Sequence, residues 1–249
     1  MLTTVSVLAA ALVLSGCAGN GNYTWGWYVL DPTRDKGASN LQFLLAGLGL
    51  TVMLSACAIA LSVVLGAALA AAARSPWAVL RTVSRGYVEC FRAVPLLVLL
   101  LWVYYGLPVV MGVQFGAFAA GVLTLALSDA AFEAEVFRAG LQSVARGQRE
   151  AAQTLGLTPW QALRFIVFPQ AVRTVLPALG NQFVYVLKMS SLVSVIGLQE
   201  LTRRANEVNV TEYRPLEIYS FLVLEYLLLI LVAAWGVRVL ERRLAGGAR

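Results

Sequence analysis

Two groups of residues in this sequence are suited to chemistry, and both interrupt a very apolar chain. The first is the polar stretch 150–169, which lies among several arginines. It predicts two short helices, the first ending near Gly156, a residue suited to a left-handed C-cap. The second helix has Thr158 as its N-cap, Pro159 at its first position and Gln161 in the capping-box place. A polar, basic hairpin between apolar segments is suited to binding another protein.

The second group consists of charges inside or near apolar runs, which are costly in lipid and therefore face a cavity or a partner. These residues are Asp129, Glu133, Lys188 and Glu225. They line a path for a zwitterionic molecule or pair with one another, and for Lys188 and Glu225 both interpretations stay open. For Glu133 and Glu135 we expect pairing with Arg138, because Glu135 and Arg138 stand three apart on one helix face.

Other kinds of chemistry have no support in the sequence. There is no histidine, and the three cysteines, Cys17, Cys57 and Cys90, are far apart, so we expect no metal site and no disulfide. No G-x-x-x-x-G-K-[ST] phosphate loop is present. We therefore expect that the chain is not an enzyme, binds no cofactor and obtains energy from elsewhere. A membrane-embedded enzyme is a weak alternative for the same reasons.

The composition predicts a polytopic membrane protein. The 249 residues are 59% hydrophobic and 13% charged, whereas soluble domains carry about 25% charged residues. The fold class is all-α, because only helices or closed barrels satisfy their backbone in lipid, and barrel strands would alternate apolar and polar residues. Five core spans are expected, at residues 42–73, 87–110, 117–137, 174–197 and 217–240.

Some positions in these spans have a more specific meaning. Small residues such as Ser62 and Gly66 in the first span let helices approach closely. Pro95 near the start of the second span is tolerated or produces a kink, and Arg92 is a basic residue at the boundary. Ser191, with the preceding serine, packs across helices or contacts a transported molecule.

The distribution of basic residues sets the expected orientation. One set of connections holds Arg74, Arg81 and Arg85, the arginines between residues 138 and 173, and the basic tail at 241–249. The other set holds few basic residues, or balances them with acids as in the loop 199–216. The positive-inside rule places the first set, the hairpin and the C-terminus in the cytoplasm.

The N-terminal segment 1–37 allows several interpretations. Residues 2–16 are apolar but short for a span, and Leu14-Ser15-Gly16-Cys17 resembles a lipoprotein cleavage box, although no Lys or Arg precedes it. A cleaved or lipidated signal, an extra membrane-inserted helix and a mis-assigned start all stay open. The aromatic-rich residues 20–40 fit the outer membrane interface.

The hairpin also carries a resemblance. Glu150-Ala151-Ala152, three residues, Gly156, nine residues, Ile166, one residue and Phe168-Pro169 match the EAA signature of ABC-importer permeases, with Phe168 where Leu is commoner. Flanking segments, among them Phe91-Arg92-Ala93-Val94-Pro95-Leu96, Leu176-Pro177-Ala178-Leu179-Gly180-Asn181 and Lys188-Met189-Ser190-Ser191-Leu192, are similar to the polar amino-acid branch, which takes up histidine, glutamate, glutamine, arginine and opines. The resemblance covers roughly residues 38–240.

The resemblance implies a type I ABC-importer permease fold and an ATP-driven uptake function in the bacterial inner membrane. It implies that the hairpin, residues 146–170, docks into a groove on a separate ATPase subunit, and that the importer contains two such subunits, which use the ATP. The implied coupling residues are Glu150, Ala151, Ala152, Gly156, Leu157 and Pro169. The permease would pair with itself or a similar permease and receive cargo from an external amino-acid-binding protein, with the loop 199–216 and residues 20–40 facing it. The bilayer is a further partner, and nucleic acid is not one.

The sequence therefore predicts a transmembrane permease domain over residues 38–240. Its candidate substrate path contains Asp129, Lys188, Ser191 and Glu225. The alternative is an ion-coupled secondary amino-acid transporter, with Asp129, Lys188 and Glu225 as the ion pathway. Such folds often show inverted repeats, and this sequence has no convincing internal repeat.

Overall fold

A computed structural model describes residues 23–245, so residues 1–17, for which a signal, an extra helix and a mis-assigned start stay open, lie outside the described residues. The described part is helical and contains no β-strand. Four helical segments are long and apolar enough to cross a membrane, and a fifth crossing would be a bent pair of helices. The prediction of an all-α membrane protein is confirmed, and the five expected core spans are reached when the bent pair counts as one span.

The longer helices build the body of the molecule. They are α3 (Gly47–Ala72), α4 (Ala78–Ala93), α7 (Ala117–Gln142), α10 (Phe168–Met189) and α12 (Pro215–Ala245). The remaining elements connect or extend them: η1 (Trp27–Leu30), α2 (Asp35–Leu45), α5 (Leu96–Leu101), η2 (Trp102–Gly106), α6 (Leu107–Met111), α8 (Arg146–Thr154), α9 (Pro159–Ala162), η3 (Leu163–Val167), η4 (Ser190–Ile196) and α11 (Leu201–Glu212).

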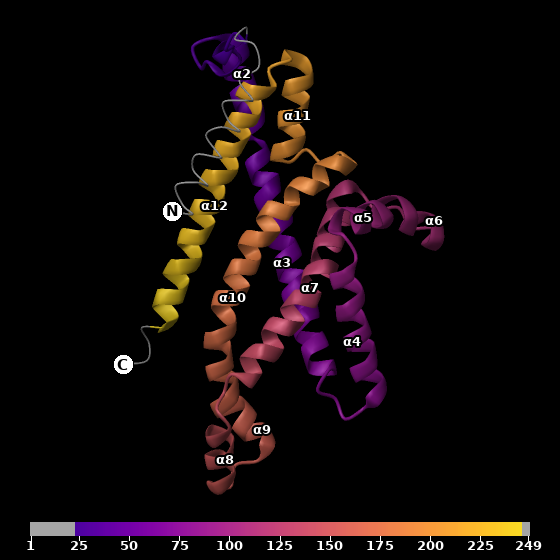
Figure 1. The fold of residues 1–249 in the computed structure, drawn as a ribbon, viewed down its shortest axis with the longest axis vertical. Helices are drawn as coiled ribbons and strands as arrows, with labels where there is room; N and C mark the ends of the chain where they lie inside the picture. Colours follow the sequence, from indigo (N-terminus) through magenta and orange to yellow (C-terminus); the bar gives the residue numbers. More distant parts are fainter. Residues whose placement is uncertain (1–22, 246–249) are drawn as a thin grey trace, which may run out of the picture.

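The molecule is elongated, with different elements at its two ends (Figure 1). The short helices α8 and α9 form one tip, which we call the hairpin end. The helices α2 and α11 lie together at the opposite tip, which we call the α11 end. The helices α3, α7 and α10 run between these ends, and α12 descends from the α11 end toward the hairpin end.

The most extensive packing in the described chain is between α3 and α7. Apart from Leu54, the buried face of α3 is a stripe of small residues, Gly47, Thr51, Ser55, Ala58, Ser62, Gly66 and Ala70. A Cβ atom at Gly66 would overlap the Cβ of Glu133 on α7 and lie 3.1 Å from the backbone nitrogen of Ala134. Small residues therefore bring the two helix backbones together, which is how helices associate in lipid.

The second span differs from the expected continuous helix over residues 87–110. The helix α4 begins earlier, at Ala78, and ends at Ala93, after which the chain bends by 105° into α5. Val94 is extended (ψ 127°), as the residue before a proline usually is, and Pro95 has no N–H to continue the helix. The sequence left open whether Pro95 is tolerated or produces a kink. In the structure, the helix breaks there, and α5 and α6 run sideways from α4.

Two other expected boundaries were also wrong. The fourth span, expected at residues 174–197, is part of a helical run from Pro159 to Ile196, because the second helix of the hairpin continues through η3 into α10. The charged loop expected at residues 199–216 contains the helix α11. The side chain of Glu200 caps it by accepting a hydrogen bond from the backbone N–H of Arg203, at 2.7 Å.

Polar contacts hold α2 and α11 together at the α11 end. The ammonium of Lys36 lies 2.9 Å from the carboxylate of Glu212. Arg204 on α11 donates a hydrogen bond to the carbonyl of Phe43 on α2, at 2.9 Å. Glu217, at the start of α12, accepts hydrogen bonds from the hydroxyl of Tyr23 and from a backbone N–H. The segment before the first span is thus bound to the last two helices.

The close approach of α3 and α7 gives a testable consequence. We expect Gly66→Ala to destabilise the protein by about 1–3 kcal/mol, because the added methyl group meets packed backbone. Gly49→Ala is the matched control on the same helix, where a Cβ would meet open space. Thermal unfolding of both variants in detergent measures the difference. Equal unfolding temperatures would show that the α3–α7 contact does not require a glycine.

Candidate functional site

The helix α8 ends in a Schellman motif, which sets the shape of the hairpin. Gly156 has a φ of 73°, in the left-handed region. Its N–H donates to the carbonyl of Gln153 at 2.9 Å, and the N–H of Leu157 donates to the carbonyl of Ala152 at 3.0 Å. This pair of bonds satisfies helix-end carbonyls and reverses the chain direction. The predicted left-handed cap at Gly156 is present.

The next helix begins with a capping box. The backbone N–H of Gln161 donates to the hydroxyl of Thr158 at 3.3 Å, and the side-chain oxygen of Gln161 accepts from the N–H of Thr158 at 2.9 Å. Pro159 occupies the first turn, where its missing N–H costs nothing. Two local signals on either side of Leu157 therefore fix both helix ends of the hairpin, as the sequence predicted.

The implied coupling residues do not all face outward. Glu150, Ala151, Gly156 and Pro169 are exposed, and Leu157 is half-buried. Ala152 is fully buried within the hairpin, so its small side chain serves the packing of the hairpin itself. The outer surface also carries large apolar side chains, with Leu155 77% and Trp160 66% exposed. An exposed apolar surface on a polar hairpin is typical of a protein-binding site.

Asp129 lies between three helices. It is buried on α7 and accepts a 2.8 Å hydrogen bond from the hydroxyl of Ser62 on α3. The side-chain amide of Gln182 on α10 donates a second hydrogen bond to the same carboxylate. Asp129 therefore joins α3, α7 and α10 through polar contacts, in a region where uncompensated charges are costly.

The other acids of α7 have different environments. Glu135 and Arg138 form the predicted ion pair, with 2.6 Å between their charged atoms. Glu133 does not pair with Arg138, and that prediction was wrong. Its side chain faces α3 at Gly66, is fully buried, and has no hydrogen-bond partner among the described residues for either oxygen.

The remaining path residues lie at the other end of α10 and on α12. The side chain of Lys188 is exposed and forms no ion pair with a carboxylate of the described chain. The hydroxyl of Ser191 donates to the carbonyl of Lys188 at 2.8 Å. Glu225 on α12 is buried, and both its oxygens lack a hydrogen-bond partner among the described residues. The structure pairs neither Lys188 nor Glu225 internally.

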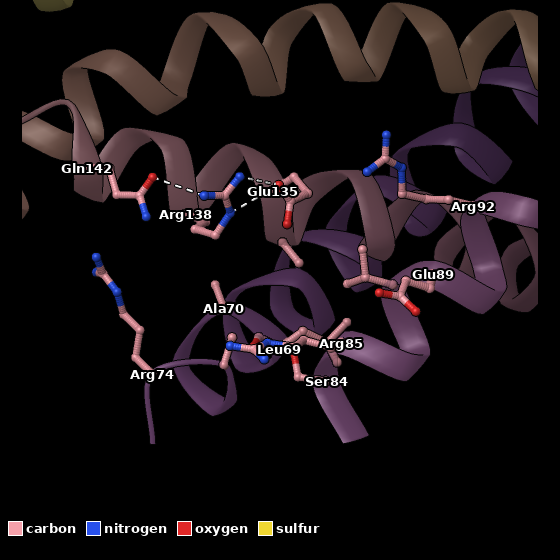
Figure 2. Close-up of a pocket in the computed structure, with 13 residues that line it drawn as sticks. Leu69, Ala70, Arg74, Ser84, Arg85, Glu89, Arg92, Glu135, Arg138 and Gln142 are labelled. Atoms are coloured by element: carbon pink, nitrogen blue, oxygen red, sulfur yellow. Dashed lines mark hydrogen bonds and ion pairs between the residues drawn. The ribbon is translucent and has the colours of Figure 1, made fainter. Parts of the chain in front are cut away.

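A cavity of about 510 Å³ lies between α3, α4 and α7 (Figure 2). Most of its polar lining is charged, and we call it the charged cavity. It is lined by Leu69, Ala70, Ala73, Arg74, Ser84, Arg85, Val88, Glu89, Arg92, Ala134, Glu135, Arg138 and Gln142. Figure 2 shows Arg138 held between Glu135 and Gln142, with Arg74 across the open space.

The α11 end presents a second polar surface. A groove of about 360 Å³ is lined by Arg203, Asn206, Glu207, Val210 and Thr211. The hydrogen bond that Gln199 donates to Glu207, together with the nearby Arg203, holds the pKa of the Glu207 carboxyl below its ordinary value. Glu207 is therefore charged at neutral pH, and this surface carries both signs of charge.

Several of these contacts were not predicted from the sequence. Ser62 and Gln182 bind Asp129, although each lies in a different span. A polar residue in an apolar run signals a polar contact, but spacing along one helix cannot identify a partner on another. Similarly, the charged cavity brings together arginines that are far apart in the sequence. From the sequence alone, each of them is only a basic residue at the boundary of a span.

Comparison with protein families gives one match over most of the chain. The family described as binding-protein-dependent transport system inner membrane component matches residues 62–246. These residues include the whole hairpin, all four residues of the candidate path and the charged cavity. Among the described residues, only those before position 62, which include the first part of α3 and the segment preceding it, lie outside the family match.

Similar curated proteins are named as transport permeases. A probable glutamine ABC transporter permease of Bacillus subtilis is 38% identical over 205 residues, covering 82% of this chain and 94% of that protein. The glutamine transport system permease of Escherichia coli K12 is 35% identical over 207 residues, with coverage of 82% and 94%. An arginine transport system permease of Bacillus subtilis is 32% identical over 204 residues.

Solved structures share the fold. A crystal structure of an amino acid ABC transporter with histidines matches with a TM-score of 0.81 and 36% identity, covering 89% of this chain and all of that chain. An inward-facing structure of the MetNI methionine ABC transporter matches with a TM-score of 0.69 and 19% identity, which shows the fold alone.

Proposed function

Because the chain belongs to the family of binding-protein-dependent transport system inner membrane components and is an ABC-importer permease, we propose that it carries polar amino acids by alternating access. The family and its several apolar helices make it a multi-pass protein of the inner membrane. Relatives named for glutamine and for arginine support a polar amino-acid cargo.

The observation that carries this proposal is the exposed hairpin. It projects from one tip of the molecule and displays Leu155 and Trp160 to solvent. The chain has no phosphate loop, so ATP is bound and hydrolysed by separate subunits. Two such subunits dock on the hairpins of two permeases, either identical or similar, with Glu150, Ala151, Gly156 and Leu157 at the contact.

The continuity of α9, η3 and α10 supports the coupling mechanism. One helical run from Pro159 to Ile196 begins in the hairpin and reaches Lys188 near its far end. A displacement of the hairpin by the closing ATPase subunits would therefore tilt α10 as a lever. Such rigid-body motion alternately opens a central path to either side of the membrane.

The orientation follows from charge. The connection between α3 and α4, the start of α4 and the hairpin carry arginines, among them Arg74, Arg81 and Arg85, and α12 runs toward the hairpin end with Arg242 and Arg243 in its last turn. The positive-inside rule places this end and the C-terminus in the cytoplasm. The α11 end then faces outward, where the groove of Glu207 and Val210 and the segment 23–45 receive the amino-acid-binding protein.

Lys188 is the leading candidate for cargo contact among the path residues. Its ammonium has no internal carboxylate partner, and every amino acid carries a carboxylate. Ser191 stands three residues further, and Glu225 is a buried acid with both oxygens unpartnered. Asp129 is engaged by Ser62 and Gln182, so its part in the path is to hold the helices that form it.

The energy source tests the proposed function directly. We expect uptake of a polar amino acid into proteoliposomes only when the ATPase subunits, ATP and the binding protein are present. Radiolabelled uptake with and without each component measures this dependence. Uptake driven by a proton or sodium gradient without ATPase subunits would instead establish an ion-coupled secondary transporter.

The hairpin provides a second test. Gly156→Arg adds a long side chain and strains a left-handed position, so we expect normal membrane insertion but loss of co-purification with the ATPase subunit. Gly147→Arg is the control, because Gly147 is helical on α8, where a Cβ would meet open space. Unchanged ATPase association of the Gly156→Arg complex would contradict the docking role.

Lys188 gives the third test. Lys188→Met removes a charge-assisted hydrogen bond worth about 1.5–3 kcal/mol, so we expect uptake efficiency to fall roughly tenfold to a hundredfold. Lys188→Arg keeps the charge and should retain most of the activity. ATPase association of both variants, measured in parallel, separates a lost cargo contact from a misfolded permease. Equal uptake by the Met and Arg variants would remove Lys188 from the path.

A further inference from the structure

The arginines of the charged cavity are only partly neutralised. Four arginines and two glutamates line it, and one of these glutamates, Glu135, is already paired with Arg138. Arg85 and Arg92 form no ion pair with a carboxylate of the described residues. The guanidinium of Arg92 lies 5.5 Å from the centre of the Phe132 ring, and Glu135, which is already paired with Arg138, is the carboxylate that interacts with it at longer range. The cavity therefore favours an anionic group.

A second cavity, of about 400 Å³, adjoins the first. We call it the apolar cavity, because Arg74 is the only polar residue among those that line it. Its walls come from α3, α7, η3 and α10: Ala67, Ala70, Ala71, Arg74, Phe137, Leu141, Leu163, Phe168, Ala171, Val172, Val175, Leu176 and Leu179. Ala70 and Arg74, at the end of α3, line both cavities. Each volume is within the range of about 300–1,000 Å³ typical of small-molecule sites.

The outer surface beside the charged cavity is suited to lipid contact. Trp77, directly before α4, is 71% exposed, and Val83, which precedes the cavity-lining Ser84 on α4, is 63% exposed. Tryptophan at the end of a span is typical of the membrane interface, and valine of its hydrocarbon region. A molecule in the bilayer headgroup layer would therefore have the charged cavity beside it.

We propose that the two cavities together bind one anionic phospholipid, with its phosphate group between Arg85 and Arg92 and an acyl chain in the apolar cavity. Basic pockets between transmembrane helices commonly bind anionic headgroups. A transported amino acid would occupy the charged cavity, but it has no long apolar chain that would fill the apolar cavity. The shared wall at Ala70 and Arg74 therefore favours an amphiphile over a free anion.

The site would have a consequence for the movement of the hairpin. Leu163 and Phe168 lie where the hairpin joins α10, and both line the apolar cavity. An acyl chain there would pack between this junction and Ala67 and Ala71 of α3. The bound lipid would thus fill the space between α10 and the packed helices α3 and α7. This role adds to the proposed transport function and does not depend on the identity of the cargo.

Native mass spectrometry of the full-length protein in a mild detergent tests the proposal. We expect phosphatidylglycerol to be retained in preference to phosphatidylethanolamine. The double variant Arg85→Gln/Arg92→Gln should bind phosphatidylglycerol roughly 25-fold more weakly, about fivefold for each arginine. Ala67→Leu fills the apolar cavity without changing charge, and it should also reduce retention.

Matched controls separate this site from general effects of charge and size. Arg173→Gln removes an exposed arginine on α10, and Ala68→Leu enlarges a neighbouring residue on α3; neither lines either cavity, and both should retain the lipid. Equal retention by the double variant and Arg173→Gln would overturn the proposal. The proposal would also be overturned if inorganic phosphate displaced the lipid and Ala67→Leu left lipid retention unchanged, because this result would show a site for a free anion. If the double variant lost amino-acid uptake but retained the lipid, Arg85 and Arg92 would be assigned to cargo binding, and the proposal would be overturned as well.

Discussion

The close contact between α3 and α7 is the constraint on which the other features depend. Helices in lipid gain little from burying apolar surface against each other, so close packing and interhelical hydrogen bonds must hold them. Here Gly66 admits the backbone of α7, and one turn away Ser62 binds Asp129, which also binds Gln182 on α10. These contacts join three helices at the level of Asp129, and α7 in turn leads directly into the hairpin.

The helical run from Pro159 to Ile196 connects the hairpin to the interior of the protein. Its first residues form the capping box that closes the hairpin, and its last turns carry Lys188. No flexible loop separates these two sites, although η3 widens the helix locally into a π-helical turn. The proposed coupling mechanism relies on this continuity, because a flexible loop of the same length would absorb a displacement of the hairpin.

The acids of α7 show how much of the candidate site was predictable. Glu135 and Arg138 were paired correctly from the sequence, because a separation of three residues places both on one helix face. Glu133 was wrongly assigned to the same arginine, since its burial against Gly66 depends on the position of another helix. The hairpin caps at Gly156 and Thr158 were predicted for the same reason as the ion pair, as they involve residues within one or two turns.

The sequence by itself therefore determined the all-α membrane class and the conformation of the hairpin. These properties depend on apolar length, on the positions of glycine and proline, and on contacts between residues close along the chain. Only the tertiary structure decided the partners of Asp129, the isolation of Glu133, the sideways turn of α5 after Pro95, and the two adjoining cavities. Each of these depends on which faces of separate helices meet, and helix packing is set by shape across the whole bundle rather than by spacing along one segment.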